Sequence, residues 1–188
     1  MGWLNKNKDI PSSDFTLMLV RFVCDFKQIY KILDELLPDA HKDLRKNDRV
    51  VVEILLIRLF VVTKLTNLLI DKKVAEKILD DLHSMIFSAI ETSDLKIDLK
   101  QLPLLLNDRY EEYYRALGNI EKDKDKNGSS SFILGTVIAA HILDMDTKSK
   151  EFHSIDPKLA MDCYIDFISL YTAEEKVFSK IKRQIRIG

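Results

Sequence analysis

The sequence predicts an all-α fold, an irregular bundle of about six or seven helices with two largely buried central helices. Glycine and proline are scarce, and they stand between segments in which apolar residues recur at steps of three and four. Two segments, residues 50–70 and 132–143, are apolar around most of a helix's circumference, which is typical of helices inside a protein. The alternating stretch at 95–100 is too short to build a sheet.

Length and composition limit the possible classes of protein. A chain of 188 residues has the size of one ordinary domain, so we expect a single all-α domain over 1–188. Its 29 Lys and Arg nearly balance its 30 Asp and Glu, which gives no overall attraction to nucleic acid. Cys24 and Cys163 form no paired motif, and no apolar signal segment follows the polar start, so we expect a cytoplasmic protein.

The first predicted helix runs from Ser12 or Ser13, either of which can cap it, to about Leu37, where Pro38 ends it. One apolar seam steps along this helix by threes and fours, as in long helices that pack nearly antiparallel. The seam consists of Phe15, Leu19, Phe22, Phe26, Ile29, Leu33 and Leu36.

The helix over 50–70 carries an unusual polar residue, Arg58. A short helical connector at 40–46 leads into this helix, and Asn47 caps its start. Glu53 lies on a narrow polar stripe, whereas Arg58 lies among apolar residues on the opposite side. A guanidinium there has to reach a carboxylate or water, because an unpaired buried charge costs several kcal/mol.

Two further helices and a loop are expected in the middle of the chain. Asp71 can cap the first of these helices, and the second runs from Pro103 to Gly118. One face of the second helix should be half buried; it consists of Leu106, Tyr110, Tyr113 and Leu117. The charged and serine-rich segment 119–131 then predicts a flexible loop.

The buried helix at 132–143 carries two small residues one turn apart, Gly135 and Ala139. Another backbone could therefore approach it closely at that point. Asp156 as the cap and Pro157 as the first helical residue predict the start of the last helical region.

The end of the chain is a predicted basic helix at 172–187. Thr172 and Glu175 form a capping-box pattern, so we expect the chain to bend and begin a new helix there. Its cations are Lys176, Lys180, Lys182, Arg183 and Arg186. Such a helix could lie on a membrane surface, but its apolar residues continue the preceding seam, which favours a helix that closes the core.

The loop contains one pattern with a metal-binding counterpart. Asp123, Asp125, Asn127 and Gly128 stand at positions one, three, five and six of an EF-hand calcium loop, where alternating oxygens converge on the ion. Position twelve is Leu134 in place of the bidentate glutamate. The pattern therefore indicates at most a low-affinity calcium site, and a solvated turn is the alternative.

A second candidate site would use the polar residues of the two buried helices. If those helices pack together, Arg58, His141 and Asp144 could converge in a pocket that binds an anion or performs acid–base chemistry. The alternative is that each is a satisfied structural group. The sequence contains no glycine-rich phosphate loop, no G-x-S-x-G, no H-E-x-x-H and no C-x-x-C motif.

Helical seams outnumber any catalytic constellation, so the leading hypothesis is a non-enzymatic helical interaction or adaptor module. Its partner would be another protein or a second copy of the chain, as in a homodimer. A small-ligand-binding protein or enzyme built on Arg58, His141 and Asp144 is one alternative. Peripheral membrane association through the basic C-terminal helix is the other.

Overall fold

The computed structural model describes the backbone of residues 9–122, 129–182 and 184–186. These residues form an all-α structure, which confirms the predicted fold class. The seven α-helices are α1 (Ser12–Val23), α2 (Phe26–Leu36), α3 (Asp48–Leu69), α4 (Lys72–Glu91), α5 (Leu102–Lys122), α6 (Ser129–Ile142) and α7 (Pro157–Ile181). Two 3₁₀ helices, η1 (Asp39–Lys46) and η2 (Lys150–Ser154), and two short strands, β1 (Ile10–Pro11) and β2 (Ile185–Arg186), complete them.

The chain divides into two compact units. Unit 1 comprises Met1–Asp25, Arg58–Asp94 and Tyr171–Gly188, and unit 2 comprises Phe26–Ile57 and Leu95–Leu170. Helices α3 and α7 each begin in unit 2 and end in unit 1. A single domain over 1–188 stays a prediction.

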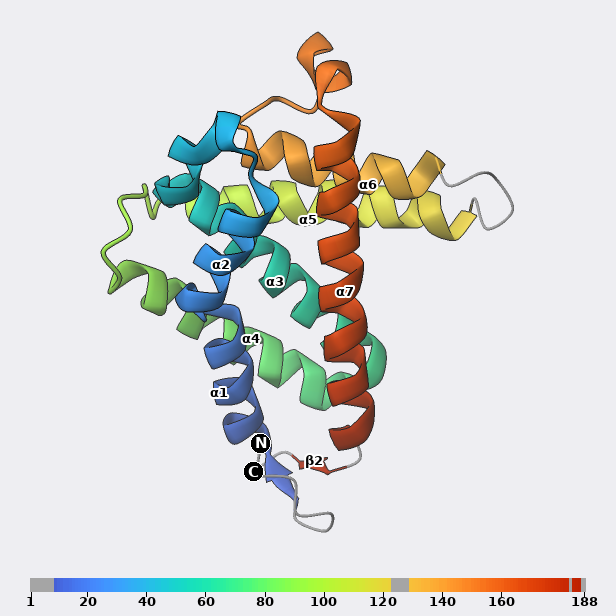
Figure 1. The fold of residues 1–188 in the computed structure, drawn as a ribbon. Coiled ribbons are helices and arrows are strands. Elements are labelled where there is room, and N and C mark those ends of the chain that lie inside the picture. Colours follow the sequence, from blue (N-terminus) through green and yellow to red (C-terminus); the bar gives the residue numbers. More distant parts are fainter. Residues whose placement is uncertain (1–8, 123–128, 183, 187–188) are drawn as a thin grey trace. The chain divides into compact units, whose positions relative to one another are not determined.

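In unit 1, α1 packs along α4 (Figure 1). The apolar seam of α1 supplies this core, and the Phe15 ring meets the Phe178 ring of α7 edge to face, with the ring centroids 5.3 Å apart. The buried residues of α4 follow the predicted helical spacing; they are Ala75, Ile78, Leu82, Ile86 and Ile90.

The predicted basic helix over 172–187 is wrong at both ends. Helix α7 passes through Thr172 without a break and ends at Ile181. Beyond it β2 pairs in parallel with β1, in a register that sets Ile185 opposite Ile10. Ile185 is buried in this extended segment, where the sequence had predicted a further helical turn.

The single helix predicted from Ser12 to Leu37 is also wrong, because it is two helices separated at Cys24 and Asp25. The break occurs beside the carbonyl oxygen of Phe22, which in a continuous α-helix accepts the amide four residues later. Here that oxygen accepts the Arg58 guanidinium, Nη2 to O 2.5 Å, and the Asp25 amide at 3.4 Å. A buried cation thus takes up an acceptor that helix continuation would use.

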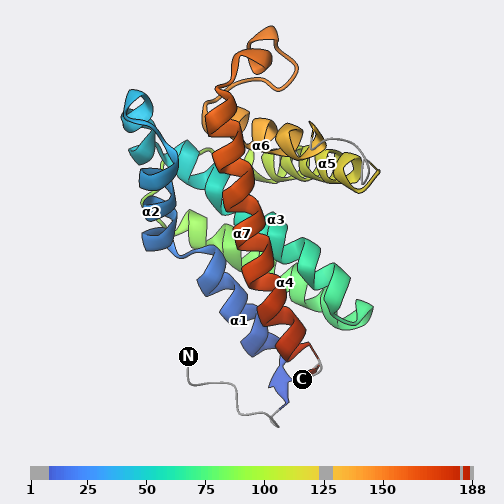
Figure 2. The same cartoon turned by 45° about the vertical axis from the view of Figure 1, so that its right-hand side comes forward.

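In unit 2, α5 and α6 lie side by side (Figure 2). Gly135 of α6 faces α7, and a Cβ added to it would collide with the backbone carbonyl of Ala160 and lie 2.9 Å from the Cβ of Tyr164. The predicted close approach at Gly135 is therefore confirmed, and its neighbour is α7.

Both predicted apolar helices are buried over most of their length. Every residue from Val50 to Thr63 in α3 and from Leu134 to Ile142 in α6 is buried. Their central position in the fold stays a prediction. Among the described helices, none combines the length and the apolar character that crossing a membrane requires.

Three of the predicted helix caps are confirmed, whereas the cap expected at Ser12 or Ser13 is wrong, because α1 begins at Ser12 after Pro11 and has no side-chain cap. Asn47 accepts the amide of Arg49, Asp71 accepts that of Lys73, and Asp156 accepts that of Lys158, each at 2.9 to 3.1 Å. The alternating stretch at 95–100 forms no strand, as expected.

The end signal at Gly118 fails, because α5 continues to Lys122. Glycine ends a helix when it adopts a left-handed conformation, and Gly118 does not. Since α6 begins at Ser129, helices occupy both ends of the loop predicted at 119–131.

Candidate functional site

The three residues of the predicted pocket are distributed over both units. Arg58 belongs to unit 1, and His141 and Asp144 belong to unit 2. Each has partners within its own unit. The shared pocket stays a prediction.

Arg58 is almost completely buried, with 2% of its surface exposed. Its guanidinium lies over the Phe22 ring, 4.4 Å from the centroid, and donates from Nη2 to the Phe22 carbonyl. Nε and Nη1 are buried without a hydrogen-bond partner among the described residues. Burial lowers the pKa of Arg58, and the charges of Asp25 and Glu174 raise it. The expected carboxylate thus acts through the electrostatic field, and the direct contacts are a carbonyl and a ring.

His141 pairs with a glutamate that the sequence reasoning missed. Its Nε2 lies 2.6 Å from Oε2 of Glu112 on α5, and only 3% of the His141 side chain is exposed. The Thr147 hydroxyl donates to the other carboxylate oxygen at 2.8 Å. The hydrogen bond with His141, assisted by that of Thr147, lowers the pKa of Glu112 to about 2, although burial opposes this. The rings of Tyr113 and His141 also meet in a T-shaped arrangement, with their centroids 5.9 Å apart.

A second buried ion pair lies one turn earlier on α5. Arg109 donates from Nε and Nη2 to the two carboxylate oxygens of Glu53 on α3, at 2.8 and 2.6 Å. Burial alone would lower the pKa of Arg109, but the hydrogen bonds and charge of Glu53 raise it overall. The Glu53 side chain has no exposed surface. This bidentate geometry neutralises a charge inside the helical core.

Asp144 lies at the surface after the end of α6. Its carboxylate pairs with the Arg49 guanidinium, and its backbone adopts a left-handed conformation, φ 61°. Aspartate tolerates this conformation better than most residues, and it ends the helix here. Asp144 therefore serves the turn after α6 and the start of α3.

These polar groups join α3, α5 and α6 within unit 2. Glu53 pairs with Arg109 and Glu112 pairs with His141, and all four side chains are mostly buried. Such a network fixes the register of packed helices. No group of three metal-binding side chains occurs in the described parts of the chain, and Asp123, Asp125 and Asn127 of the calcium pattern lie outside them.

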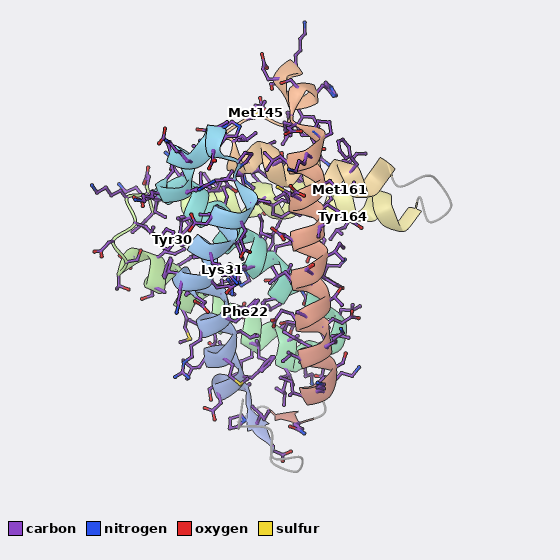
Figure 3. The ribbon with its side chains drawn as sticks, viewed as in Figure 1. Phe22, Tyr30, Lys31, Met145, Met161 and Tyr164 are labelled. Carbon is purple, nitrogen blue, oxygen red and sulfur yellow. The ribbon has the colours of Figure 1, made fainter. Side chains whose placement is uncertain are left out.

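Helix α7 carries apolar residues on two faces. The inner face of this helix is buried through Leu159, Ala160, Cys163 and Phe167. On its outer face Met161, Ile165 and Ile168 are 42%, 52% and 37% exposed. Their spacing of four and three places them on one stripe of the helix. We call these three residues the apolar stripe; Figure 3 shows Met161 projecting from α7, with Tyr164 beside it.

Carboxylates lie next to the apolar stripe. Asp162 and Asp166 each follow a stripe residue directly, so both lie on the same flank. Burial, followed by the charges of Asp162 and of Glu35 on α2, raises the pKa of Asp166. We call Glu35, Asp162 and Asp166 the acidic flank.

Sequence reasoning missed the apolar stripe and the α5 network for different reasons. Helix α7 has apolar residues on two faces, and its period alone does not show which face is covered. On α5, the spacing of Arg109, Glu112 and Tyr113 already placed them on one face, but their partners lie on other helices, which this spacing does not indicate. The predicted half-buried face of α5 is confirmed, since Tyr113 is buried and Leu106, Tyr110 and Leu117 are half-buried. The buried residues among its described side chains are Leu102, Arg109, Tyr113 and Ala116.

Comparison with known proteins gave no match: no family model matches the chain, and neither curated proteins nor solved structures show significant similarity to it.

Proposed function

We propose that the chain is a non-enzymatic helical interaction module that binds another protein through the outer face of α7. The observation that carries this proposal is the apolar stripe, Met161, Ile165 and Ile168, exposed on one face of a long helix. Single exposed apolar residues are normal on protein surfaces, but residues in helical register form a continuous contact line. Docking of a partner would remove that line from water.

The described contacts support this role better than an enzyme or ligand pocket. His141 and Asp144 already have carboxylate and guanidinium partners, and His141 is almost fully buried. A ligand would have to break those pairs before it could bind. The stripe requires no such rearrangement.

The basic end of α7 gives less support to membrane association. In that segment Phe178, Ile181 and Ile185 are buried in unit 1, and Val177 is 38% exposed. One exposed valine beside the exposed Lys176 and Lys180 offers little apolar surface with which to enter a bilayer.

The two cysteines suit a reducing compartment such as the cytoplasm. Both are free, and burial raises the pKa of the Cys24 thiol to about 11 and also raises that of Cys163. Both side chains stay protonated and unreactive at neutral pH.

Selection from a displayed library of helical peptides tests the proposed function. We expect the wild-type chain to enrich peptides that no longer bind after the double substitution Ile165→Gln and Ile168→Gln. Val177→Gln is the matched control, because Val177 is an exposed apolar residue elsewhere on α7. Enrichment that survives the double substitution, or that Val177→Gln abolishes equally, would contradict the proposal.

A further inference from the structure

We propose that the partner of the α7 face is a basic amphipathic helix of another protein, an inference that rests on the proposed function and specifies its partner. The juxtaposition that carries it is the apolar stripe beside the acidic flank, both within unit 2.

The stripe determines the form of the partner. Met161, Ile165 and Ile168 cover about two helical turns, roughly 10 Å along the axis. A helix that presents apolar residues at i, i+3 or i+4, and i+7 can lay them along such a line. An extended segment repeats its side chains every second residue, so it matches this spacing less well.

The acidic flank determines the partner's charge. Among the described residues, Lys31 lies 3.6 Å from Glu35, and Lys158 stands one turn before Asp162. Negative charge therefore remains in excess around Asp166. Burial and the charges of Asp162 and Glu35 raise the pKa of this side chain, so its ionised form is already disfavoured. Lys or Arg at the edge of a docked helix would relieve this repulsion and guide the encounter.

The same charges disfavour a second copy of the chain as the partner. In an antiparallel pairing centred on Ile165, the same flanks of the two helices meet, so Asp162 of one copy approaches Asp166 of the other within about one turn. A parallel pairing sets the acidic flank against the opposite flank, which carries Tyr164 and no cation. Neither arrangement neutralises the carboxylates. An anionic membrane surface is disfavoured for the same reason.

Two designed helical peptides with identical apolar residues test the charge of the partner. One carries Lys at the positions beside its apolar line, and the other carries Glu. Fluorescence anisotropy with the full-length chain gives the two dissociation constants at low and high salt. We expect the Lys peptide to bind at least about tenfold more tightly at low salt, and the ratio to shrink at high salt.

Three variants test whether the peptides bind at the apolar stripe and the acidic flank. Ile165→Gln should weaken both peptides about tenfold, because it removes the middle of the stripe. Val177→Gln should change neither. The pair Asp162→Asn and Asp166→Asn should abolish the preference for the Lys peptide, because the remaining charge on the flank is Glu35 paired with Lys31. These positions are at least partly exposed on α7, so the fold should tolerate the substitutions.

The outcomes separate this inference from the proposed function. Equal affinities that both depend on Ile165 would leave the interaction face intact and overturn the basic partner. A preference that persists without the two aspartates would overturn it as well. Affinities that do not depend on Ile165 would contradict both proposals. A dimer of the peptide-free chain in sedimentation, lost in Ile165→Gln, would make a second copy the occupant and overturn the inference.

Discussion

Arg58 bonds the chain beside the break between two helices. Its Nη2 donates a hydrogen bond to the Phe22 carbonyl near the end of α1, while Nε and Nη1 have no hydrogen-bond partner among the described residues. We expect Arg58→Met to leave stability unchanged or to raise it by about 1–4 kcal/mol, since an apolar side chain of similar length removes an incompletely satisfied charge. Urea unfolding measures the change. A loss of more than about 2 kcal/mol would show that the guanidinium stabilises the break between α1 and α2.

The Glu53–Arg109 pair behaves differently, because each member depends on the other. Arg109→Met leaves the Glu53 carboxylate buried and uncompensated, so the free energy of unfolding should fall by about 3–5 kcal/mol. Adding Glu53→Leu removes that charge, and most of the lost stability should return. If the double variant is less stable than Arg109→Met alone, the pair contributes more than neutralisation.

Glu112 should make unfolding depend on acid pH. Its folded pKa of about 2 lies below the ordinary 4.5, so its contribution to stability is complete above pH 4.5 and is lost as the pH falls toward 2. Asp166 and Glu174 have raised pKa values and act with the opposite sign, so the comparison must be with a matched variant. We expect the stability of Glu112→Gln to fall less steeply than that of the wild type over this range. Parallel curves would mean that the His141 contact does not hold Glu112 ionised.

At the scale of elements, the packing of α6 on α7 depends on the absence of one side chain. Gly135→Ala introduces a Cβ that collides with the Ala160 backbone, which should cost about 1–3 kcal/mol. Gly118→Ala is the matched control: it also lies inside a helix, nothing lies within 4 Å of its added Cβ, and it should stabilise by up to about 1 kcal/mol. Thermal unfolding of both variants measures the difference. Equal effects would mean that the backbones do not approach at Gly135.

Elements that are determined by residues close by in the sequence could be predicted, whereas those that depend on distant residues could not. The starts of α3, α4 and α7 follow from single capping residues, Asn47, Asp71 and Asp156, and were predicted correctly. The break at Cys24 lies beside a hydrogen bond from Arg58, more than thirty residues away, and was not predicted. The burial of Glu53 likewise depends on a partner in α5. Apolar period and caps therefore predict helices, while the pairing of distant charges requires the structure.

At the scale of the whole molecule, the fold class follows from composition and period, while the interaction face does not. Helix α7 carries apolar residues around much of its circumference, as a buried helix would. Only the packing of its inner face leaves Met161, Ile165 and Ile168 at the surface. The function that we propose thus rests on the apolar residues of α7 that the core leaves exposed.

Hydrogen–deuterium exchange of the full-length chain, with and without the Lys peptide, tests this account most directly. Docking on the outer face of α7 should slow amide exchange in the part of α7 that carries the stripe and in α2 next to the acidic flank. Amides of α4, in unit 1, should exchange at the same rate in both samples. Protection confined to α4, or none in α7 at a saturating peptide concentration, would contradict the account.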